Sequence, residues 1–167
     1  MNWIILRTKT DKLRYSIIST IVAFILGLYF YTIPFAAEHI YFFISAPIAT
    51  FFPSLFLWKW KFKTTKNYKI GNVLSVALIL TLITHYLNFV VIGIGRILCY
   101  YLTGKCTDYT GQTESLLGTL TYISWFRMLI SLYNFGFLTF VIVSSVGIYV
   151  MKTSNLLHNK SQLESNQ

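Results

Sequence analysis

The stretch LWKWKFKTTKNYKI, residues 57–70, decides the fold of this chain, because it is strongly basic while the segments on both sides are almost purely apolar. A basic segment between two apolar ones is typical of a cytoplasmic loop between two membrane spans. Its alternating aromatic and basic residues also suit an interfacial anchor, where each lysine near anionic headgroups contributes about 1 kcal/mol. We expect contact with anionic lipid from Lys59, Lys61, Lys63, Lys66 and Lys69.

The composition excludes an ordinary soluble domain. Of the 167 residues, 55% are hydrophobic and only 11% are charged, whereas a soluble domain carries about 25% charged residues. The net charge of +9 would suggest nucleic acid as the partner of a soluble protein. Here the basic residues sit at the edges of apolar segments, so we predict contact with lipid and no nucleic acid.

Four apolar stretches are long enough to cross a bilayer, which takes about 20 residues of helix. They cover about 16–36, 41–58, 71–95 and 129–151. They use up most of the chain, so we predict one domain over residues 1–167. Its fold class is all-α, a polytopic membrane protein with four transmembrane helices. We expect the polar tail, 153–167, to be frayed.

An additional helix is expected on the outer surface, before the fourth span. As one helix, Ser115–Met151 would be about 55 Å long, far more than a hydrocarbon core of about 30 Å. It must therefore break, tilt strongly or project. We expect an outer-surface helix from Ser115 to Phe126 and then a turn near Arg127.

The placement of charge predicts the orientation. Four basic residues precede the first apolar stretch, five lie in 57–70 and two follow the last stretch, all on one side of a four-span chain. Lys and Arg beside short loops stay in the cytoplasm. We therefore expect both termini inside, in what we take to be a bacterial inner membrane. A cleaved signal peptide is the competing interpretation, but the apolar run from Ser16 is too long for one.

Polar residues inside the spans are few and share one face. Thr81, Thr84, His85 and Asn88 follow helical spacing on the third span, and Asn134 lies on the fourth. Such side chains point into a bundle, because exposing them to lipid is costly. Two interpretations stay open: hydrogen bonds that join helices, or a proton or ligand site. A lone histidine without further ligands predicts no metal.

Both cysteines, Cys99 and Cys106, fall in the outer loop between the third and fourth spans. On the oxidising side of a membrane they predict a structural disulfide, which Gly104 would allow by supplying a turn. Quinone-coupled disulfide-generating membrane enzymes need a second cysteine pair in another outer loop, and the first outer turn, 37–40, has none. Other catalytic motifs are also absent, so we expect no enzyme activity and no cofactor.

The outer loop is the best candidate for a functional surface. It combines exposure, both signs of charge and tyrosines, which suit recognition. We expect partner binding through Tyr100, Tyr101, Lys105, Asp108, Tyr109, Glu114 and Arg127. In size and composition the chain resembles immunity proteins against pore-forming bacteriocins, superinfection-exclusion proteins and small assembly subunits. The resemblance implies a non-catalytic protein that binds a membrane or envelope partner.

The alternative is a subunit of a small transporter or flippase for a lipid-linked or small polar substrate. The basic and aromatic stretch 57–62 resembles one that follows the second span in small four-span proteins of polyprenyl-linked sugar translocation. Those proteins repeat it after the last span, and 150–153 does not. Transport would need polar side chains that converge in the bundle, and His85, Asn88 and Asn134 are the candidates.

Overall fold

The structure is a computed structural model that describes residues 3–31, 42–62, 68–106 and 115–165. Within these ranges the chain is helical and forms no strand. The elements are α1 (Trp3–Tyr31), α2 (Phe42–Phe62), α3 (Ile70–Thr103), α4 (Leu116–Gly118), the π-helix η2 (Thr119–Ile123), α5 (Ser124–Ser131), the π-helix η3 (Leu132–Gly136) and α6 (Phe137–Ser165).

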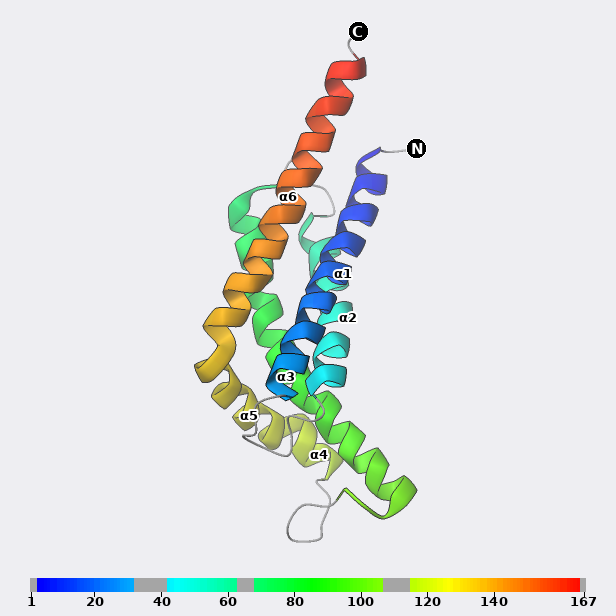
Figure 1. Ribbon diagram of the computed structural model, residues 1–167, viewed down its shortest axis with the longest axis vertical. Coiled ribbons are helices and arrows are strands. Elements are labelled where there is room, and N and C mark those ends of the chain that lie inside the picture. Colours follow the sequence, from blue (N-terminus) through cyan, green and yellow to red (C-terminus); the bar gives the residue numbers. More distant parts are fainter. Residues whose placement is uncertain (1–2, 32–41, 63–67, 107–114, 166–167) are drawn as a thin grey trace.

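Four helical segments are long and apolar enough to cross a membrane: Thr10–Tyr29, Phe42–Phe62, Ile70–Thr103 and Leu116–Leu156. The all-α, four-span prediction is therefore confirmed. The start of α1, the end of α2, the start of α3 and the end of α6 lie at one end of the molecule, which we call the termini end (Figure 1). The other end holds the two cysteines near the end of α3, and we call it the disulfide end.

Several predicted boundaries were too short. The first helix begins at Trp3, and α3 continues past 95 to Thr103. The tail that we expected to be frayed is helical as far as Ser165. Its first turns are held to α1, because the Thr153 hydroxyl accepts a hydrogen bond from the Arg14 guanidinium at 3.4 Å. Hydropathy reports only the part of a helix that lies in lipid, so it misses extensions into water.

The predicted turn near Arg127 was wrong. Arg127 lies inside α5, and helical structure continues from Leu116 without a loop. The direction changes at η3 instead, where α5 crossing the disulfide end meets α6 running toward the termini end (Figure 1). A π-helical turn adds a residue to the ladder and bends a helix without breaking it. The outer-surface helix that we expected is therefore not separate: the helical segment 116–136 is continuous with the fourth span.

The tightest packing lies in the half of the bundle at the termini end. Tyr15, Trp58, Phe62 and Tyr68 are buried there. The ring centroids of Trp58 lie 4.4 Å from those of Tyr15 and 4.6 Å from those of Phe62. These side chains come from α1, α2 and the segment just before α3, so their packing joins these three parts of the chain. Aromatic pairs in this geometry add about 0.5–1.5 kcal/mol each beyond their buried area.

Two glycines allow close crossings nearer the disulfide end. A Cβ on Gly27 of α1 would lie 2.7 Å from the Cα of Phe43, against the backbone of α2. A Cβ on Gly93 of α3 would lie 2.2 Å from Cγ2 of Thr119, which is fully buried in η2. Small residues let membrane helices approach in this way. Gly93 is thus a packing contact inside α3.

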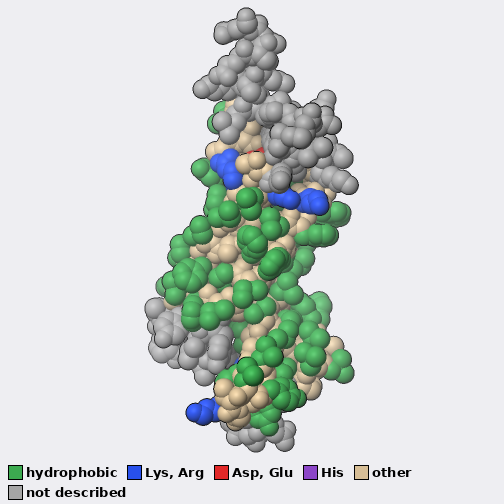
Figure 2. Space-filling model, turned by 90° about the vertical axis from the view of Figure 1, so that its right-hand side faces the viewer, with side chains coloured by type: hydrophobic (Ala, Val, Ile, Leu, Met, Phe, Trp, Pro, Cys, Tyr) green, Lys and Arg blue, Asp and Glu red, His purple; other side chains and the backbone are tan. Residues whose placement is uncertain are grey.

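The surface has the distribution that a bilayer requires. Figure 2 shows a belt of hydrophobic side chains over the middle of one face, with basic side chains beyond it toward the ends. Phe52 and Phe56 of α2 are 67% and 69% exposed, as expected for lipid-facing residues. Lys59 and Lys69 are exposed near the termini end and Lys61 is half-buried, while Lys63 and Lys66 lie outside the described residues.

Candidate functional site

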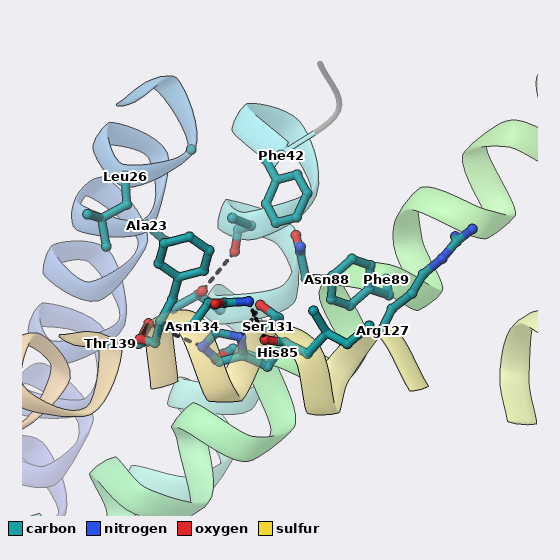
Figure 3. Close-up of a pocket in the computed structure, with 16 residues that line it drawn as sticks. Ala23, Leu26, Phe42, His85, Asn88, Phe89, Arg127, Ser131, Asn134 and Thr139 are labelled. Atoms are coloured by element: carbon teal, nitrogen blue, oxygen red, sulfur yellow. Dashed lines mark hydrogen bonds between the residues drawn. The ribbon is translucent and has the colours of Figure 1, made fainter. Parts of the chain in front are cut away.

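A cavity of about 610 Å³ lies in the disulfide-end half of the bundle, among α1, α2, α3, α5, η3 and α6. Its volume falls within the range of about 300–1,000 Å³ typical of small-molecule sites. Figure 3 shows side chains from these elements converging on it. The polar residues on its walls are Thr50, Thr84, His85, Asn88, Arg127, Ser131, Asn134 and Thr139. The structure thus brings together four of the five predicted intramembrane polar residues and adds Arg127.

His85 bridges three elements through both ring nitrogens. Its Nδ1 lies 2.7 Å from the Ser131 Oγ, and its Nε2 lies 3.2 Å from the Thr139 Oγ1. The Thr139 hydroxyl donates to the Phe135 carbonyl at 3.0 Å, so its oxygen accepts from Nε2–H. The Nδ1 lone pair then accepts from Ser131, which is the pattern of a neutral imidazole. This arrangement supports the joining role that we had left open for His85.

Asn88 is different, because within the described part of the chain only the oxygen half of its amide is hydrogen-bonded. Its Oδ1 accepts a hydrogen bond from the Ser45 Oγ at 2.6 Å. No residue that the structure describes accepts from its Nδ2, although Asn88 is only 6% exposed and lines the cavity. A buried polar group without a partner costs about 1–3 kcal/mol. Asn88 is therefore the side chain of the site whose hydrogen-bonding capacity is left for something in the cavity.

The π-helix η3 shapes the opposite wall. The Asn134 amide donates to the Ile130 carbonyl at 2.9 Å, beside the Thr139 bond to Phe135. Side-chain donors of this kind satisfy carbonyls where the helical ladder is irregular. π-Helical turns are often found at functional sites. Here η3 turns Asn134 and Ser131 toward the same space.

Arg127 lies at the edge of the cavity on α5. It is the one charged residue among the described residues that line the cavity. Its side chain extends away from His85 and Ser131, past Phe89 (Figure 3). The sequence had grouped Arg127 with the outer loop, and the structure places it beside the intramembrane polar residues. Thr81 is buried on α3 and donates to the Ala77 carbonyl at 2.9 Å, but does not line the cavity.

The described part of the predicted outer surface is the end of α3. The Sγ atoms of Cys99 and Cys106 are 1.97 Å apart and their Cα atoms 5.9 Å apart, so the pair is at disulfide distance. Gly104 caps the helix in the left-handed region at φ 66°, and its N–H donates to the Tyr100 carbonyl. Tyr101 is 77% exposed. Asp108, Tyr109 and Glu114 lie outside the described residues.

One buried cluster was missed from the sequence. Asp11 of α1 is 3% exposed, and its carboxylate accepts hydrogen bonds from the Tyr68 and Ser154 hydroxyls. Arg14 lies 3.9 Å from the same carboxylate. The sequence feature that could have pointed to this cluster is Asp11 itself, a single acidic residue within a basic N-terminal segment. The hydroxyls of Ser45 and Thr139 carried no signal, because serine and threonine are common in membrane helices.

The described side chains of the site offer hydrogen bonds. Within the described ranges, no three His, Cys, Asp or Glu side chains come together as metal ligands would. What the arrangement can do is hold a molecule that accepts hydrogen bonds.

Comparisons with protein-family models, with curated proteins and with solved structures returned no match, so the proposals below rest on this chain's own residues.

Proposed function

We propose that this protein is a small, non-catalytic integral membrane protein that binds another membrane or envelope protein at its disulfide end. The observation that supports this proposal is the exposed end of α3, where Cys99 and Cys106 lie at disulfide distance. As a helix of 34 residues, α3 is about 51 Å long. Even at a tilt of about 40° it exceeds a hydrocarbon core of about 30 Å. Part of α3 therefore extends beyond the hydrocarbon core.

The end of α3 has the properties of a recognition surface. The rings of Tyr100 and Tyr101 are 5.7 Å apart, and Leu102 beside them is 81% exposed. Tyrosine is common at the energetic centres of protein interfaces. The turn at Gly104 and the link from Cys99 to Cys106 restrict this surface before binding, which lowers the entropy cost of association.

The proposed orientation places this surface on the side of the membrane away from the cytoplasm. Basic residues flank the spans at the termini end, and such residues remain in the cytoplasm. The proposal therefore includes cytoplasmic termini, lysine contacts with anionic headgroups, and an inner membrane of bacterial type.

The test compares two exposed tyrosines at opposite ends. Tyr101→Ala should abolish the in-cell phenotype and the cross-link formed by a photoreactive residue at Leu102. Tyr149→Ala is the matched control, because Tyr149 on α6 is 54% exposed near the termini end. A Gly/Ser linker in place of 105–113 is the broader variant. If expression and phenotype survive both the linker and Tyr101→Ala, partner binding at this end is wrong.

A transporter or flippase subunit is the second candidate function. The observation that favours it is the convergence of Thr84, His85, Asn88 and Asn134 on one cavity. The buried ring of Trp58 with Tyr15 and Phe62 closes the other half of the bundle, so a substrate path would require that half to open. Transport predicts a phenotype that fails in Asn88→Leu and survives the linker replacement. Partner binding predicts the reverse.

A further inference from the structure

We propose that the cavity binds a small amphipathic lipid, with its apolar chain against the wall that α1 and α2 form and an oxygen-rich head group accepting a hydrogen bond from Asn88. The inference concerns the cavity alone. It goes beyond partner binding at the disulfide end and requires no transport across the membrane.

The cavity has room for an occupant. A volume of about 610 Å³ equals roughly 20 water molecules at about 30 Å³ each. Ala23, Gly27 and Ala46 are among its walls. Gly27 lets α1 pack against the backbone of α2, and the small side chains of Ala23 and Ala46 leave space on the cavity side of this crossing. Phe42 and Phe89, in edge-to-face contact at 5.7 Å, complete an apolar wall that suits a hydrocarbon chain.

The polar groups decide the chemistry of the head group. The Nδ2 of Asn88 provides two N–H donors, and no described residue accepts from them. The Oδ1 of the same amide is engaged with Ser45 at 2.6 Å, which fixes Nδ2 as the available atom. His85 contributes no free nitrogen, because Ser131 and Thr139 occupy both. The ligand atom facing Asn88 must therefore be an acceptor oxygen.

Charge favours an anionic head over a cationic one. Arg127 lines the cavity, and none of the lining residues is Asp or Glu. A guanidinium is well suited to phosphate and carboxylate oxygens. Among the described residues that line the cavity, an ammonium head would meet this cation and no carboxylate. The shared chemistry is thus a phosphate or carboxylate oxygen, which a lipid head group or a free anion could supply.

The position of the site within the spans favours a lipid over a free anion as the occupant. Ala23, Ala46 and Asn88 all lie within segments apolar enough to span the membrane. A molecule that partitions into the bilayer reaches such a depth readily, whereas a free anion must leave water first. A lipid also fills the apolar wall that an inorganic anion would leave empty.

The experiment uses the full chain in detergent micelles and a diazirine-bearing lysophosphatidic acid as the probe. After irradiation, peptide mapping should place most of the label on 42–50 and 84–89, and unlabelled lysophosphatidic acid should compete for it. Asn88→Leu should reduce this labelling by roughly tenfold, as expected for losing a hydrogen bond to a charged group. Ala46→Phe, which fills the cavity, should reduce it as well. Inorganic phosphate should not compete.

Matched controls separate the site from general lipid contact. Asn72→Leu changes an amide on the same helix α3 outside the cavity and should leave labelling unchanged. Arg127→Gln should weaken labelling by the phosphate probe more than by its neutral monoacylglycerol analogue. Size-exclusion profiles verify that each variant is folded. If Asn88→Leu does not fold, the label map and competition on the unchanged protein decide. Label spread over the lipid-facing Phe52 and Phe56, or competition by phosphate alone, would overturn the proposal.

Discussion

The Asp11 carboxylate accepts a hydrogen bond from the Tyr68 hydroxyl at 2.9 Å, although 57 positions separate the two residues. Ser154 donates to the same oxygen from α6. One buried acid therefore joins α1, the segment just before α3, and α6 at the termini end. The neighbouring aromatic side chains exclude water from it, and hydrogen bonds to a charged group in such surroundings are stronger than in water.

Removing one donor to Asp11 should destabilise the bundle. Ser154→Ala is expected to lower the free energy of unfolding by about 1.5–3 kcal/mol, the range for hydrogen bonds to charged groups. Ser145→Ala is the matched control on the same helix, because Ser145 is exposed and donates only to the Val141 carbonyl. Circular dichroism during denaturation in mild detergent measures both. Equal stability of the two variants would contradict the role of Asp11.

The crossing of α3 and η2 should depend on Gly93. Gly93→Ala would ordinarily stabilise a helix by about 1 kcal/mol. Here the new Cβ would lie 2.2 Å from Thr119 Cγ2, so we expect a lower midpoint of thermal unfolding. Gly95→Ala is the control, because nothing lies within 4 Å of its added Cβ. Adding Thr119→Ser, which removes Cγ2, should restore part of the loss. A Gly93→Ala protein as stable as Gly95→Ala would rule out the close crossing.

Cys99 and Cys106 should be covalently linked in the mature protein. Closing a loop of this size is expected to contribute about 2–3 kcal/mol to local stability, so reduction should speed proteolysis between 103 and 115. Mass spectrometry without reduction should find the two peptides joined. The double variant Cys99→Ser with Cys106→Ser should show the faster proteolysis without reductant. Two free, alkylatable thiols in freshly prepared membranes would contradict the prediction.

Both termini and the lysine-rich loop should face the cytoplasm. Single cysteines at Thr65 and Ser161, introduced into a chain lacking Cys99 and Cys106, should resist an impermeant thiol reagent added to intact cells. A cysteine restored at 106 should react with it and serves as the positive control. Permeabilised cells should label all three positions. Labelling of either Thr65→Cys or Ser161→Cys from outside would reverse the proposed orientation.

The sequence was a good guide to individual helices and a poor guide to their ends and bends. The face shared by Thr84, His85 and Asn88 could be predicted, because helical spacing alone puts those residues together. The turn expected near Arg127 was misplaced, since no proline or polar run marks η3. The backbone hydrogen bonds of η3 are irregular, and the side chains of Asn134 and Thr139 donate to carbonyls there. The other contacts of these side chains require the folded bundle.

The fold class and the number of membrane spans followed from the sequence by itself. Transfer of a segment into a bilayer depends on its apolar content. In addition, every backbone polar group must be satisfied within its own helix. The tertiary structure alone decided which helix faces meet. The bond of Ser45 to Asn88, the junction at Asp11 and the cavity beside Arg127 all join residues far apart in the chain. They depend on side-chain packing and interhelical hydrogen bonds, which local composition does not encode.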